Sequence, residues 1–147
     1  MRGDLNLVKL CVGVEKVSDL ARWQAIRADE ARAKGEVYTP HHVTRMWPRR
    51  ADELLDGGSL YWVFKGLILA RQEILRLDEV IGDDGIRRCG IVFNPCLILT
   101  QTHARRAFQG WRYLQKSDAP KDIGPYIEGD QELPGALQAE LSALGVL

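Results

Sequence analysis

The sequence predicts an α+β fold built on a curved antiparallel sheet or a small β-barrel, with one long N-terminal helix and short peripheral helices. Short apolar runs rich in β-branched and aromatic residues recur along the chain, and a DDG hairpin turn joins two of them. One long helical pattern with clear end signals follows the first run. With 147 residues, 46% of them hydrophobic, the chain has the size and composition of a single domain with one core.

The first two elements are the most clearly marked. The run LNLVKLCVGV is apolar on both alternating faces, which is typical of a buried strand. The helical pattern that follows begins at Ser18, a good N-cap residue, and ends at Gly35, which suits the position after the helix. Leu20, Trp23 and Ile26 fall near one stripe, so we expect this stripe to face the core.

The middle of the chain reads as strands separated by turns. HHVTRMWP favours a strand that ends at Pro48, RRADELLDGG a short helical turn, and SLYWVFKG a second aromatic strand. Residues 67–81 fit both a helix and a strand. The run has no N-cap residue at its start, beside Gly66, as a helix would. We therefore favour a long bent strand with a glycine kink.

The later runs complete the predicted sheet. IRRCGIVFNP returns from the DDG turn, and CLILTQ and FQGWRYL are further strand candidates. PGALQAELSALGVL has its leucines on one side at helical spacing, which predicts a short amphipathic helix at the C-terminus.

Charge is distributed unevenly, although the chain as a whole is neutral. Residues 41–116 carry twelve Lys and Arg against eight Asp and Glu, whereas residues 117–147 carry one Lys against six acids. Overall neutrality excludes a polycation that coats nucleic acid or membrane indiscriminately, but the basic middle permits a local anion-binding surface. We expect one domain over residues 1–147, with the acidic segment 118–147 at its periphery.

The spacing of the cysteines and histidines predicts no metal site, and no cofactor is expected. The cysteine pattern and the N-terminal run predict a cytoplasmic protein. The three cysteines lie in apolar runs with no CxxC spacing, which suits a reducing compartment. The histidines and cysteines lack the short spacings of zinc sites. The N-terminal run is interrupted by charge, and no stretch approaches the roughly 20 apolar residues that span a bilayer. No membrane partner is expected.

Two stretches combine arginines with aromatic rings, and they are the candidate binding surface. Proteins that bind nucleic acid pair Arg or Lys, which contact phosphates, with rings on which unpaired bases stack. The first stretch supplies Arg45, Trp47, Arg49 and Arg50; the second supplies Arg105, Arg106, Trp111, Arg112 and Tyr113. We expect a noncatalytic module that binds RNA or a modified base, with Trp47, Trp111 or Tyr113 as the stacking ring. This requires the two stretches to lie side by side. The alternative is that the rings belong to the core and the arginines to a solvated rim.

Two other functions are compatible with the sequence. Lys65, between YWVF and GLIL, is a lysine that burial would activate, and with a nearby carboxylate it would form the centre of a small-molecule hydrolase. Exposed aromatics and arginines are also the preferred anchors of protein interfaces, so a protein–protein adaptor or a homo-oligomer fits the same composition.

Long motifs in the chain carry a family resemblance. HVTRMWPRRADELLDGGSLYWVFKG, ARQEIL, DGIRRC and FQGWRYL resemble a family of small alphaproteobacterial proteins known as domain of unknown function 1489. The resemblance implies a bacterial cytoplasmic protein and transfers no catalytic or binding residue.

A second resemblance concerns the layout of the elements. An early helix, a curved sheet and a late aromatic-basic strand are similar to the PUA-like group of small barrels, which includes the ASCH and EVE domains. That resemblance implies binding of RNA or modified bases, or an amidohydrolase with Lys65, Thr44 and Glu73 in its catalytic roles. KGLILARQ departs from the glycine-lysine-glutamate-arginine pattern of that group.

Overall fold

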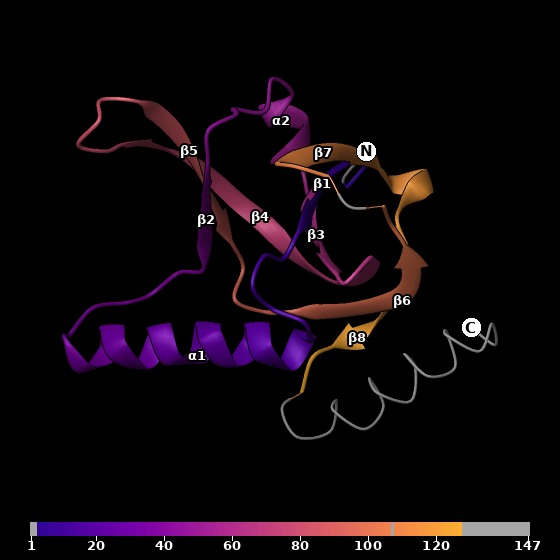
Figure 1. Ribbon diagram of the computed structural model, residues 1–147, viewed down its shortest axis with the longest axis horizontal. Coiled ribbons are helices and arrows are strands. Elements are labelled where there is room, and N and C mark those ends of the chain that lie inside the picture. Colours follow the sequence, from indigo (N-terminus) through magenta and orange to yellow (C-terminus); the bar gives the residue numbers. More distant parts are fainter. Residues whose placement is uncertain (1–2, 107, 128–147) are drawn as a thin grey trace.

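The computed structural model describes residues 3–106 and 108–127, and over these residues the fold is α+β (Figure 1). The two α-helices are α1, Val17–Ala33, and α2, Ala51–Leu54, and a short 3₁₀ turn covers Lys116–Asp118. The strands are β1 Leu5–Leu10, β2 His41–Thr44, β3 Ser59–Phe64, β4 Leu67–Ile81, β5 Arg87–Phe93, β6 Ile98–Ala104, β7 Trp111–Gln115 and β8 Asp122–Pro125. The predicted C-terminal helix, and the part of the acidic segment beyond residue 127, lie outside the described residues.

The strands form one sheet with the order β2-β5-β4-β3-β1-β7, and β6 and β8 continue from β4. Only β1 and β3 pair in parallel among the described strands; the other pairs are antiparallel. Ile74 pairs with Phe93 of β5, and Arg71 pairs with Ile98 of β6. Consequently β5 and β6 run consecutively along one edge of β4, and β3 occupies the other edge.

Residues 67–81 form a strand, so the strand interpretation is confirmed. The kink expected at Gly66 is instead a tight hairpin turn, because Phe64 pairs directly with Leu67. Lys65 has φ 47° and Gly66 has φ 82°, and two successive positive φ values are typical of the two-residue turns that match the twist of paired strands.

The sheet bends back on itself without closing into a barrel, so the barrel alternative is wrong for the described residues. Its two terminal strands, β2 and β7, share no ladder. They are linked through a side chain: the indole N–H of Trp111 donates to the backbone carbonyl of Met46, just after β2, at 3.0 Å. The coarse prediction of an α+β fold on a sheet with mostly antiparallel strands, with helices around it, is confirmed.

Helix α1 lies along one side of the sheet and uses a different face from the one expected (Figure 1). Val17, Leu20 and Gln24 are buried, whereas Trp23 and Ile26 are 45% and 50% exposed. The expectation of a Leu20, Trp23 and Ile26 stripe is therefore wrong for its last two members. The helix contacts the sheet through a polar residue in its middle, and this explains the shift.

A buried amide pair joins α1 to the sheet. The side chains of Gln24 and Gln72 donate to one another at 3.0 and 3.1 Å, and Gln72 is fully buried on β4. The Gln72 amide also accepts from the indole N–H of Trp62 and donates to the carbonyl of Asn94. Because these buried polar groups satisfy one another, the polar side chain on α1 is accommodated inside the core.

The turn between α2 and β3 approaches β1 very closely at Gly58. A Cβ atom at this position would lie 2.4 Å from the carbonyl oxygen of Leu54 and 2.5 Å from that of Leu5. Only glycine fits such an approach without moving the backbone.

None of the described helices is long and apolar enough to cross a membrane.

Candidate nucleic-acid interface

The ends of the two basic-aromatic stretches meet in the structure. Besides the bond from Trp111 to Met46, the backbone N–H of Arg50 donates to the hydroxyl of Tyr113 at 3.1 Å. The guanidinium carbon of Arg50 also lies 5.7 Å from the centroid of the Tyr113 ring. Residues 46–50 therefore pack against β7, more than 60 residues away in sequence.

The second stretch surrounds an open depression of about 610 Å³ between β6 and β7. We call it the arginine depression; its lining residues are Ala104, Arg105, Arg106, Phe108, Arg112 and Tyr113. The guanidinium carbons of Arg105 and Arg112 lie 5.5 and 5.2 Å from the centroid of the Phe108 ring. Both distances fall within the range of cation–π contacts, so the ring holds two positive charges at this depression.

The local backbone fixes these side chains. The Arg112 guanidinium donates to the carbonyls of Gln109 and Trp111 at 2.8 and 2.9 Å. Phe108 is half-buried and packs on an apolar cluster of the outer sheet face that includes Val8 and Leu114. The ring is thus anchored by the core while the arginines extend from it toward solvent.

The arginines of the depression have no neutralising partner in the described part of the chain. Neither Arg105, Arg106 nor Arg112 has a carboxylate within ion-pair distance among the described residues, whereas Arg50 pairs with Glu53. Uncompensated guanidinium groups around a hollow raise the local positive potential of an otherwise neutral molecule.

The two expected tryptophan rings are both in contact with other side chains, and only one of them is buried. Trp111 is only 4% exposed and lies edge-on to Tyr113, with ring centroids 5.0 Å apart. The Arg87 guanidinium carbon lies 4.1 Å from the ring centroid of Trp47, and the indole N–H of Trp47 is buried with no acceptor among the described residues. The expectation of an open Trp111 platform is therefore wrong, whereas Trp47 is half-exposed with the Arg87 guanidinium over its ring. Phe108 and Tyr113 are the half-exposed rings that line the depression.

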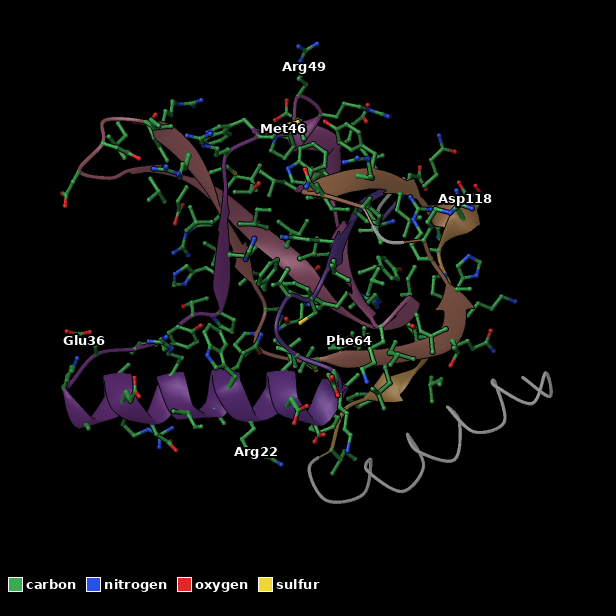
Figure 2. All side chains as sticks on the ribbon, in the orientation of Figure 1. Arg22, Glu36, Met46, Arg49, Phe64 and Asp118 are labelled. Atoms are coloured by element: carbon green, nitrogen blue, oxygen red, sulfur yellow. The ribbon has the colours of Figure 1, made fainter. Side chains whose placement is uncertain are left out.

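Arg45 and Arg49 lie away from the depression. The pKa of Asp84, in the β4–β5 turn, is lowered to about 2, mainly by its hydrogen bond from Arg88, with a smaller contribution from the charge of Arg45. Arg45 follows β2, at the opposite end of the strand order from Arg112 on β7. Arg49 points outward from the top of the molecule (Figure 2). The basic residues therefore form two groups rather than one continuous shelf.

The residues of the hydrolase hypothesis are not brought together. Lys65 is at the tip of the β3–β4 hairpin, with its side chain 66% exposed and ion-paired to Glu15 at 3.1 Å. Glu73 pairs with Ser59 at the other end of that hairpin, about 20 Å away by the rise of an extended strand. Thr44 lies on β2 opposite Cys89. Neither the Glu73 carboxylate nor the Thr44 hydroxyl lies near Lys65, and the carboxylate that does contact Lys65, that of Glu15, lies with it on the exposed surface.

The lysine that burial does affect is Lys9, which the sequence reasoning missed. It is 8% exposed and lies on β1 in register with Trp62 on one side and Trp111 on the other. Burial lowers its pKa, and the nearby Cys11 opposes that effect. The alternation of Leu5, Leu7 and Lys9 on one face of the strand was the available signal, because side chains two apart share a face.

The comparison with protein families agrees with the motif resemblance. A family model described as a protein of unknown function (DUF1489) matches residues 7–147. The chain belongs to this family. No curated protein and no solved structure matches the chain. As a DUF1489 protein it receives no residue roles from its family, so its function has to be argued from the geometry of its own side chains.

Proposed function

We propose that the chain binds single-stranded nucleic acid, RNA or a strand that carries a modified base, without catalysing a reaction on it. The binding site is the arginine depression. The observation that carries the proposal is that Arg105, Arg106 and Arg112 converge there beside two half-exposed rings, with no carboxylate partner among the described residues.

The arrangement suits a flexible anionic strand. A guanidinium that lies against an aromatic ring keeps its N–H edge directed outward, and this edge matches a phosphate group. Arg105 and Arg112 both lie over Phe108; Nη1 of Arg112 is bound to backbone carbonyls, which leaves its Nε and Nη2 as donors for a phosphate. A base stacks on a guanidinium plane or on a ring, and single-stranded nucleic acid is the form whose bases are free to do so.

Three arginines contacting phosphates give a defined dependence on salt. For single strands the slope of log K against log salt is about −0.7 for each phosphate neutralised, so we expect a slope of about −2. Fluorescence anisotropy of a short labelled single-stranded RNA, titrated with the full chain at several salt concentrations, measures this slope. Binding that does not change with salt contradicts the proposal.

A pair of double variants locates the site. Arg105→Gln with Arg112→Gln should weaken binding and reduce the slope to about −0.7, since one arginine of the depression remains. Arg27→Gln with Arg32→Gln removes two exposed arginines of α1 and should change neither quantity by as much. Equal losses in the two double variants would show that binding is only diffuse attraction between charges.

The ring is tested separately. Phe108→Ala should weaken RNA binding by about 1–3 kcal/mol if a base stacks on this ring, and it also removes the surface that holds both guanidinium groups. Circular dichroism before and after heating shows whether the variant keeps the fold, since Phe108 also packs on the sheet. Unchanged affinity in a folded Phe108→Ala variant removes the stacking part of the proposal and leaves only the phosphate contacts.

A further inference from the structure

A second hollow, of about 530 Å³, lies on the outer face of the sheet at the other end of β7 from the arginine depression. We call it the tyrosine pocket; its lining residues include Asn6, Ser59, Tyr61, Arg71, Lys116, Lys121 and Asp122. We infer that this pocket binds a small phosphate monoester that also carries hydroxyl groups, such as a sugar phosphate. The inference goes beyond the proposed function and does not depend on it, because Arg105, Arg106 and Arg112 do not line this pocket.

Tyr61 is the first observation that points to a ligand. Its side chain lines the pocket although the residue is only 8% exposed. Its hydroxyl has no side-chain hydrogen-bond partner among the described residues and is not one of the buried unpartnered atoms, so it is accessible from the pocket. Burial raises its pKa, so the hydroxyl keeps its proton and is a donor at neutral pH.

Ser59 provides a second donor beside it. Ser59 is 2% exposed, and its Oγ accepts a hydrogen bond from the Arg71 guanidinium at 2.8 Å. No acceptor for the Ser59 hydroxyl proton is found among the described residues. Since Ser59 and Tyr61 are two apart on β3, both side chains point to the same face of the sheet. Two largely buried residues thus present hydroxyl groups with uncommitted protons to one hollow.

Arg71 is held in place rather than available to a carboxylate ligand. Its Nε and Nη2 donate to the two oxygens of Asp122 at 2.8 and 2.7 Å, which fills the planar fork that recognises a carboxylate. The same contact lowers the pKa of Asp122, so this group stays ionised. Each carboxylate oxygen retains a lone pair, and Asp122 therefore accepts a hydrogen bond from a hydroxyl group of the ligand.

The free positive charges of the pocket are ammonium groups. Lys116 and Lys121 line the pocket and are exposed, and neither has a carboxylate within ion-pair distance among the described residues. An ammonium group is a compact charge with three donors and no planar preference, which suits the tetrahedral oxygens of a phosphate. The pocket therefore combines lysine and hydroxyl donors with one carboxylate acceptor, Asp122, and this combination suits a phosphate that also carries hydroxyl groups.

The size of the hollow sets the ligand class. Pockets for small molecules typically measure about 300–1,000 Å³, so 530 Å³ holds one sugar phosphate. The acids that line the neighbouring hollow, Asp4, Glu53 and Asp56, are not part of this one. The two hollows adjoin at Lys116 and Ser117, which line both, and Asp122 is the one carboxylate among the lining residues of the tyrosine pocket.

Isothermal titration calorimetry of the full chain with ribose 5-phosphate tests the inference, with inorganic phosphate and ribose as comparison ligands. We expect saturable binding of ribose 5-phosphate, weaker binding of inorganic phosphate at the same site, and no binding of ribose. Absence of saturable binding by both ribose 5-phosphate and inorganic phosphate overturns the inference.

Two variants place any binding in the pocket. Tyr61→Phe retains the buried ring and removes the hydroxyl, and it should weaken ribose 5-phosphate binding about tenfold. Lys116→Gln with Lys121→Gln alters two exposed residues, so it should leave the fold intact and weaken binding more than tenfold. Lys34→Gln, an exposed lysine at the end of α1, is the matched control and should bind as the unaltered chain does.

The remaining arm separates this site from the nucleic-acid site. Arg105→Gln with Arg112→Gln should bind ribose 5-phosphate normally, whatever it does to RNA binding. If that double variant loses ribose 5-phosphate while Tyr61→Phe keeps it, the phosphate binds at the arginine depression and the inference is wrong. If all variants bind alike, the association is unspecific, which also overturns the inference.

Discussion

His42 makes the stability of the fold depend on pH in a way that one substitution isolates. Its half-buried ring lies edge-on to Trp62, with ring centroids 6.3 Å apart, on the face of β2 that meets the core. Burial is the largest cause that lowers the pKa of His42 to about 4, and the charges of Lys9 and His41 lower it further. The folded protein therefore keeps this ring neutral at a pH where the unfolded chain has protonated it.

The magnitude follows from the two pKa values. His42 has a pKa near 6.5 in the unfolded chain and about 4 when folded, which corresponds to about 3.4 kcal/mol for the whole difference. At about pH 5, His42 is mostly protonated in the unfolded chain and mostly neutral in the folded chain. The free energy of unfolding is therefore about 2 kcal/mol lower than at neutral pH. Because the ring is half-buried, solvent screening reduces this, and we expect about 1–2 kcal/mol.

Urea denaturation followed by tryptophan fluorescence, at about pH 7.5 and about pH 5, measures the loss. His42→Gln removes the titrating ring, so the difference between the two pH values should shrink by about 1–2 kcal/mol in this variant. His103→Gln, which alters an exposed histidine on β6, should behave as the unaltered chain. If His42→Gln loses as much stability on acidification as the unaltered chain, His42 is not held neutral by the fold and the reasoning fails.

Three further predictions concern packing and reactivity. Gly58→Ala should lower the free energy of unfolding, measured by chemical denaturation, by about 1–3 kcal/mol, because its Cβ would meet two backbone carbonyls. Gly82→Ala is the control: its Cβ would make only ordinary contacts, and the free energy of unfolding should change by less than about 0.5 kcal/mol. Trp111→Phe should cost about 1–2 kcal/mol more than Trp47→Phe, because only the first leaves a carbonyl without its donor; equal costs would mean that the bond to Met46 contributes nothing. Of the three thiols only Cys96 is exposed, so a thiol reagent should modify one cysteine per native chain and all three in denaturant, and mass spectrometry counts them.

Elements with local signals are predicted well from the sequence. The strand at residues 67–81 was favoured because no capping residue precedes it, and that local rule is correct here. The same region shows the limit of local reasoning, since Lys65 and Gly66 form a hairpin turn. That turn was missed because a lysine with positive φ is uncommon and has no marked sequence signal.

The faces that pack against other elements were predicted less well. Gln24 was not expected inside the core, and its burial depends on Gln72, 48 residues away, which satisfies its amide. Likewise, the sequence allows Trp111 to be an exposed stacking ring, but in the structure the ring is buried and its N–H binds the carbonyl of Met46, just after β2. In both cases the deciding partner is distant in the chain, and no local pattern carries that information.

The candidate sites were also difficult to predict from the sequence, because their residues come from segments that are far apart in the chain. The convergence of Arg50 with Tyr113 was expected in outline, because two arginine-aromatic stretches in one chain suggested a common surface. The tyrosine pocket was not foreseen, because it combines β3, β4 and the segment after β7. The contact between Ser59 and Arg71 becomes apparent only from the pairing of β3 with β4.

The position of β1 inside the sheet has a consequence for synthesis on the ribosome. Within the described chain β1 precedes both of its neighbours, β3 and β7. At translation rates of about 5–20 residues per second, the roughly 100 residues between β1 and β7 take about 5–20 s to be made. Until β7 has been made, the edge of LNLVKL that pairs with it has no partner strand, so this part of the sheet forms only after that interval.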